Sequence, residues 1–235
     1  MCAEKLDRLT NDTHFIIHPS YAEALNLREI LIDKIDLSLP LKMAGLLSDI
    51  PEAINLAQFQ THLTELIENI KTLPKGDSDA KAYEDIVGNV LKLCFFKALT
   101  NVEEQSRDLN GRVIRDWIAA NRAKDGFWAM IRQRYHSTQV IWECKNYDDL
   151  GSDVFHQASY YMNKEIGQFI VICFRGEFKK HYYEHIRRVS NEKDGGVILL
   201  LTDKDLLVFL RQALNGKTRE DHIQGIFDTT VRKIS

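Results

Sequence analysis

Two short runs of purely apolar residues constrain the fold of this sequence more than any other feature. They occupy 169–174 and 197–201, and each has the length of a buried strand. The segment between them, 177–189, has the pattern of a helix. A strand, a helix and a second strand in that order favour a parallel pair joined by a crossover, with helices covering the sheet.

The same alternation extends in both directions along the chain. Apolar spacing predicts helices at 80–97, 125–134 and 153–164, and strands near 98–106, 111–119 and 139–145. Thr202, with Asp205 three positions later, predicts a capped helix that ends before Gly216, and a last helix follows at 218–233. We therefore expect an α/β fold with a mixed central sheet of about five strands flanked by helices.

The N-terminal third has a different pattern. Helices are predicted at 21–37 and 52–73, whose apolar stripes either complete the core or meet a partner chain. Residues 74–79 are turn-forming residues and mark the clearest boundary. We expect an N-terminal helical region over 1–75 and the main domain over 76–235.

Composition limits the partners and the compartment. Hydrophobic residues make up 44% of the chain, no apolar run reaches the ~20 residues of a membrane span, and the N-terminus lacks a signal core. The four cysteines have no metal-ligand spacing, and reduced core residues of a cytoplasmic protein fit best. A net charge of −3 disfavours a broad phosphate-neutralising surface, so any binding to phosphates would need a local basic patch, a homo-oligomer or a partner protein.

The strand near 111–119 carries an inward acid. Alternation places Asp116 on the same face as Ile114 and Ile118, which is apolar. A buried carboxylate is costly unless it is paired or binds a metal. A salt bridge and a metal ligand are equally good interpretations of this residue alone.

The strand at 139–145 ends in an acid and an amine. Period-2 alternation places Glu143 and Lys145 on one face, ~6.6 Å apart along the strand. A carboxylate can hold Mg²⁺, and an ammonium can orient water or stabilise charge at a phosphate. Other acid-x-Lys triplets occur at 79–81 and 177–179, but this one alone ends an apolar strand that follows a second acid-bearing strand.

A third carboxylate comes from the helix at 80–97. Glu84 lies at the border of the apolar face, one turn before Gly88, which allows close approach of a neighbouring backbone. A glutamate at this position either reaches the sheet or remains solvated at the rim.

These residues together resemble a known family. A helix bearing Glu84, a strand bearing Asp116, the triplet Glu143-Cys144-Lys145 and then Gln157 early in the next helix resemble the PD-(D/E)xK superfamily, and within it the Mrr-like restriction endonucleases. The resemblance covers about 77–201. It departs from the pattern at 115, where an arginine stands in place of proline.

The resemblance implies a restriction-endonuclease-like core and Mg²⁺-dependent cleavage of DNA, with Mn²⁺ as a substitute, in restriction or anti-phage defence. It implies that Asp116, Glu143 and the Cys144 carbonyl bind the metal, with Glu84 on a second ion or an outer-shell water. Lys145 would position the attacking water, and Gln157 would donate to the phosphate or near Lys145. A catalytically inactive binding module and an RNase remain alternatives.

A basic segment follows the strand at 168–174. Basic and aromatic side chains alternate there, and such residues can neutralise phosphates and stack on bases. A solvated amphipathic helix is the plainer alternative, and the three tryptophans are expected in the core. The candidate nucleic-acid contacts are Arg175, Lys179, Lys180, His181, Arg187 and Arg188.

Overall fold

The computed structural model describes residues 56–107, 114–215 and 217–235, so the helix expected at 21–37 lies outside the described residues. The strands are β1 (Leu99–Arg107), β2 (Ile114–Asn121), β3 (Gln139–Lys145), β4 (Phe169–Phe174) and β5 (Val197–Thr202). The helices are α5 (Leu56–Thr72), α6 (Ala80–Cys94), α7 (Gly126–Arg134), α8 (Ser152–Tyr161), α9 (Tyr182–Glu192), α10 (Asp203–Leu214) and α11 (Glu220–Ile234), with a 3₁₀ turn at Asp77–Asp79.

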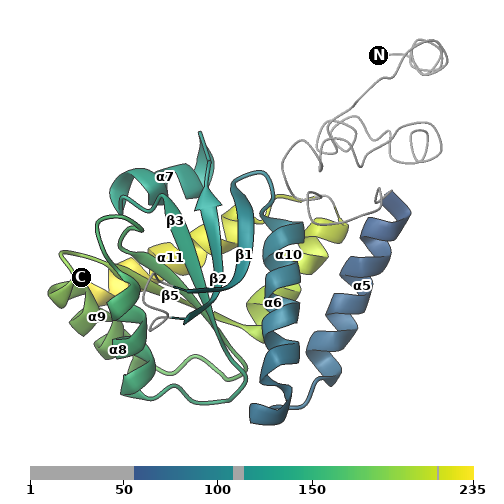
Figure 1. Ribbon diagram of the computed structural model, residues 1–235, viewed down its shortest axis with the longest axis horizontal. Coiled ribbons are helices and arrows are strands. Elements are labelled where there is room, and N and C mark those ends of the chain that lie inside the picture. Colours follow the sequence, from purple (N-terminus) through teal and green to yellow (C-terminus); the bar gives the residue numbers. More distant parts are fainter. Residues whose placement is uncertain (1–55, 108–113, 216) are drawn as a thin grey trace, which may run out of the picture.

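The five strands form one mixed sheet in the order β1-β2-β3-β4-β5. β1, β2 and β3 pair antiparallel, whereas β3, β4 and β5 run parallel. Figure 1 shows α8 and α9 on one face of the sheet and α6 and α10 on the other, with α5 packed against α6 and α10. This double cover explains why β4 and β5 are buried at every position. The expected α/β fold with a mixed sheet is confirmed.

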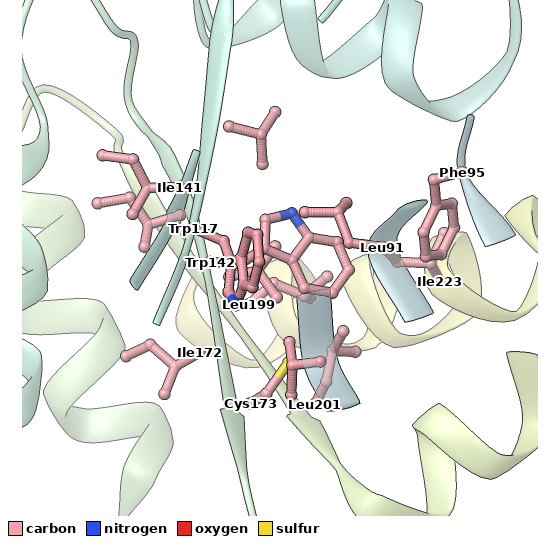
Figure 2. Packing of buried hydrophobic residues seen from close by; sticks show 14 of the residues in the cluster. Leu91, Phe95, Trp117, Ile141, Trp142, Ile172, Cys173, Leu199, Leu201 and Ile223 are labelled. Atoms are coloured by element: carbon pink, nitrogen blue, oxygen red, sulfur yellow. The ribbon is translucent and has the colours of Figure 1, made fainter. Parts of the chain in front are cut away.

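The core fills both sides of this sheet. Figure 2 shows Trp117, Trp142 and Cys173 together on one side of the strands, with Ile141 and Ile172 on the other. Trp117, Trp128 and Trp142 are all buried, as expected. The cysteines within the described residues are likewise buried and free: Cys94, Cys144 and Cys173.

Helix α5 belongs to the same core. Its stripe of Leu63, Leu66, Ile67 and Ile70 is buried and packs on α6 and α10. The stripe therefore completes the core, which was one of its two expected roles. The division of the chain at residues 75–76 stays a prediction. Among the helices within the described residues, none has both the length and the apolarity that a membrane span requires.

The capped start of α10 is confirmed in detail. The Thr202 backbone N–H and hydroxyl both donate to Asp205 Oδ2 at 2.8 Å, and the reciprocal half of the capping box is present. This box sets the point where β5 turns into α10, at the same sheet edge where β3 ends.

Candidate active site

Strands β2 and β3 bring two of the predicted acids together. Trp117 lies opposite Trp142 and Ile118 opposite Ile141, and one further step of this register sets Asp116 opposite Glu143. Directly opposed residues of an antiparallel pair point to the same face, here the face that carries Ile141 in Figure 2. We call Glu84, Asp116 and Glu143 the carboxylate cluster.

The Glu143 carboxylate is buried beside the Lys145 ammonium. The residue is only 2% exposed, and its Oε2 lies 3.3 Å from Lys145 Nζ. The Tyr161 hydroxyl of α8 also hydrogen-bonds to this carboxylate, yet Oε1 is buried without a partner of good geometry. Burial and the charge of Asp116 raise the pKa of Glu143 to about 7, against the opposing effect of Lys145.

Asp116 is held by the backbone of the neighbouring strand. The Cys144 N–H donates to Asp116 Oδ2 at 2.7 Å. Burial raises the pKa of Asp116, although this N–H and the Lys145 ammonium lower it. Burial opposes the charged form of Lys145, but Glu143 and Asp116 outweigh it and raise its pKa. The pair of acids thus carries a surplus of negative charge that one ammonium does not fully offset.

Glu84 lies near this cluster, but on α6, which covers the opposite face of the sheet. The Trp117 indole N–H donates to the Glu84 carbonyl at 2.8 Å. A Cβ added at Gly88 would lie 2.2 Å from the Trp117 ring, so the glycine allows the close approach expected of it. Burial first, and then the charge of Asp116, raise the pKa of the Glu84 carboxyl. Both interpretations of Glu84 stay open, because its backbone carbonyl contacts the sheet while its carboxylate pairs with Lys81.

The three acids differ in how well they could serve as ligands of a metal ion. Within the described residues, no three His, Cys, Asp or Glu side chains converge closely enough to hold a metal ion by themselves. Mg²⁺ is commonly bound by only one or two carboxylates, with waters and substrate phosphates completing its shell. Asp116, Glu143 and the Cys144 carbonyl offer such oxygen ligands, and the unmatched Oε1 of Glu143 fits this role. Glu84 fits less well.

Gln157 lies on the exposed side of α8 and contacts the site through a neighbour. Its Nε2 donates to the Tyr161 hydroxyl at 2.9 Å, and Tyr161 in turn contacts the Glu143 carboxylate. Sequence reasoning placed Gln157 near this site but missed Tyr161. The signal was available, since residues four apart share one face of a helix.

Arg175 is a correction to the predicted nucleic-acid surface. It is 7% exposed, and its Nε donates to Asp203 Oδ2 at 2.6 Å. The two Nη atoms donate to the side chain of Asn146 and to the Ile70 and Leu73 carbonyls at the end of α5. Its hydrogen-bonding groups are engaged inside the protein, so it is not available to a phosphate.

The remaining basic residues stay near the surface, but on a shorter helix than expected. α9 begins at Tyr182, and the residues before it contact the loop that follows β3 at two points. Lys179 Nζ lies 2.7 Å from Asp149 Oδ2, and a Cβ on Gly176 would collide with the Asp148 carbonyl. Lys179 is half-buried, and the other four basic residues are exposed. We call the five together the basic segment: Lys179, Lys180, His181, Arg187 and Arg188.

The position of the basic segment relative to the carboxylate cluster follows from the sheet. Lys145 at the end of β3 lies in register with Phe174 at the end of β4. The chain therefore leaves both parallel strands at one edge, and the first residues of the basic segment start from the edge that carries Glu143 and Lys145.

Comparisons with known proteins give little beyond this geometry. The sequence matches no protein-family model. It is similar to a protein of Escherichia coli (strain K12) described as a putative transposon gamma-delta 80.3 kDa protein, with 27% identity over 175 residues. The match takes in 69% of this chain but 23% of that protein, so the chain spans less than a quarter of this relative's length.

Proposed function

We propose that this protein is a Mg²⁺-dependent endonuclease of the PD-(D/E)xK type that hydrolyses phosphodiester bonds in DNA. One observation carries the proposal: Asp116 and Glu143 share the rim of the sheet with Lys145, and one buried oxygen of Glu143 has no partner. Buried carboxylates with raised pKa values are typical of functional sites, because burial without compensation costs stability.

Each residue of the site has a role that its position supports. Asp116 and Glu143 would hold the ion, and the Cys144 N–H keeps Asp116 oriented toward β3. Lys145, whose ammonium form is retained, would position a water or stabilise negative charge on the phosphate. A bound Mg²⁺ supplies a lowered pKa for bound water and charge neutralisation at the phosphate.

DNA is the substrate that the remaining observations favour. Lys180, an exposed member of the basic segment that follows this sheet edge, can neutralise a backbone phosphate, and Arg187 farther along α9 can extend that surface. The E. coli relative is described as a transposon protein, and transposons are made of DNA. A role in restriction or defence rests on the family resemblance alone. With a net charge of −3, we expect a partner protein or a homo-oligomer to add affinity for DNA.

A catalytically inactive binding module is the second candidate. It is favoured by the internal partners of both acids, since the Cys144 N–H and the Lys145 ammonium already engage one oxygen each of Asp116 and Glu143. Metal binding separates the two candidates. A divalent ion that binds the native state raises the melting temperature, and an inactive module without a site shows no such rise.

The decisive experiment is cleavage of supercoiled plasmid DNA with and without Mg²⁺. Wild type should nick or linearise the plasmid only with Mg²⁺, and Lys145→Ala and Glu143→Gln should not. Lys71→Ala, which removes an exposed ion pair with Glu68 on α5, is the matched control and should cut like wild type. A labelled single-stranded RNA run in parallel tests the RNase alternative. Cleavage by Lys145→Ala equal to wild type would contradict the proposal.

A further inference from the structure

Lys81 places a second ammonium beside the carboxylate cluster. It lies in the first turn of α6, one turn before Glu84. Its Nζ is 3.5 Å from Glu84 Oε2 and 2.9 Å from Asp85 Oδ1, and it also pairs with Glu104 of β1. The sequence showed this lysine only as part of an acid-x-Lys triplet at the start of a helix.

The charge of Lys81 acts on the predicted metal ligands. It lowers the pKa values of both Asp116 and Glu84, in opposition to their burial. Desolvation opposes the ammonium form of Lys81, but the contacts with Glu104 and Asp85 outweigh it and raise its pKa. Lys81 is therefore a fixed positive charge at neutral pH.

This charge bears on the number of ions that the site can take. In two-metal sites the ions lie ~3.5–4 Å apart and share the reacting phosphate. A second ion would need Glu84, yet Glu84 is already paired with Lys81, and it does not converge with Asp116 and Glu143. An ion bound to Glu84 would also be repelled by the neighbouring ammonium.

We propose that Lys81 takes the place of a second divalent ion. The site then binds one ion through Asp116 and Glu143, while Lys81 holds Glu84 and supplies the second positive charge. Lys81 acts here as a positioning residue, because it is placed to act through Glu84 and Asp116. This inference rests on the proposed function and specifies its metal stoichiometry.

Calorimetric titration of the full chain with Mn²⁺ tests the stoichiometry without measuring cleavage. Wild type should bind one ion. Lys81→Gln, which keeps most of the side-chain length but removes the charge, should bind a second ion or bind the first about tenfold more tightly. Lys81→Arg keeps the charge and should bind one ion with unchanged affinity. Lys71→Ala is the control for loss of an i,i+3 Lys–Glu pair on a helix surface.

A second variant shows which residue holds the extra ion. Adding Glu84→Gln to Lys81→Gln should abolish the second site or the gain in affinity. Melting curves with and without Mn²⁺ verify that each variant folds, and the Mn²⁺-induced rise should be larger in Lys81→Gln than in wild type. A structural ion pair alone would lower the melting temperature without changing that rise.

The outcomes separate the two proposals. Two ions in wild type, or equal stoichiometry and affinity in wild type and Lys81→Gln, would overturn the role of Lys81 and leave the nuclease proposal standing. No Mn²⁺ binding by wild type would overturn the proposed function itself, and the inference with it.

Discussion

Two groups of buried charges lie at the same edge of the sheet and differ in how well they are paired. Around Arg175, every nitrogen of the guanidinium donates to a protein oxygen, including Asp203 and the carbonyls that end α5. In the carboxylate cluster, Asp116 and Glu143 share the edge with one ammonium, that of Lys145, and Glu143 keeps a buried oxygen without a partner. Complete pairing is expected of a group that stabilises the fold, whereas surplus charge is expected of a group that awaits a ligand.

Substitutions in the carboxylate cluster should therefore affect activity far more than stability. Lys145→Ala and Glu143→Gln should each lower the rate of Mg²⁺-dependent DNA cleavage by about a thousandfold, since each removes charge that acts on the reacting phosphate or its metal. Single-turnover cleavage of a labelled duplex measures the rate. Urea unfolding of Glu143→Gln, which removes the buried charge itself, should show little loss of stability, and a large loss would mean that this cluster is structural as well.

Arg175→Met should show the reverse behaviour. It removes the ion-pair partner of the largely buried Asp203 carboxylate, to which, among the described residues, only the Tyr83 hydroxyl would still donate, and leaves several carbonyls unpaired, which costs about 3–5 kcal/mol of the free energy of unfolding. Urea unfolding monitored by tryptophan fluorescence measures this loss. Lys204→Met is the matched control, because its pair with Glu177 is exposed and should contribute less than about 1 kcal/mol. Equal effects of the two substitutions would remove the contrast between paired and surplus charge.

The pH dependence of stability sharpens the comparison. The pKa of Glu143 is raised from 4.5 to about 7 in the folded protein, so the native state binds a proton more tightly than the unfolded chain. Proton binding by Glu143 therefore adds to the free energy of unfolding, by an amount on the order of 1–3 kcal/mol. This stabilisation is fully present below about pH 4.5 and is lost as the pH rises through about 7.

Measurement of this effect requires the metal to be removed. In chelator, the stability of wild type relative to Glu143→Gln should fall between pH 5 and pH 8. Saturating Mn²⁺ should reduce this fall, because the ion neutralises the carboxylate. An identical pH dependence in wild type and variant would show that Glu143 does not titrate in this range.

The sequence predicts the strands that position the site better than it predicts the hydrogen-bond and ion-pair partners of the site residues. β3 was placed at its observed bounds because an apolar run there ends in charged residues, and Asp116 and Glu143 came together because strand alternation is regular. The prediction that Arg175 contacts nucleic acid was wrong. A basic residue after a strand has the same local sequence pattern whether its side chain faces solvent or the end of a helix. Lys81 was missed although Glu84 and Asp85 lie within one helical turn, because its contact with Glu104 of β1 forms only through packing, and Tyr161 because its contact with Glu143 joins α8 to β3.

The smallest predicted effect concerns the contact that brings Glu84 to the sheet. Alanine is favoured over glycine inside a helix by about 1 kcal/mol, but a Cβ at Gly88 would lie 2.2 Å from the buried ring of Trp117. Overpacking of this kind costs about 1–3 kcal/mol, so Gly88→Ala should be destabilising by a net amount of about 1 kcal/mol.

Gly225→Ala is the matched control for this substitution. Gly225 also lies inside a helix, α11, and nothing lies within 4 Å of an added Cβ, so that variant should be slightly stabilised. Thermal melting of both variants measures the difference. Because Gly88→Ala moves α6 away from β2, it should also alter Mn²⁺ binding if Glu84 is held beside Asp116. Unchanged Mn²⁺ binding with a lowered melting temperature would mean that the α6 contact serves the fold alone.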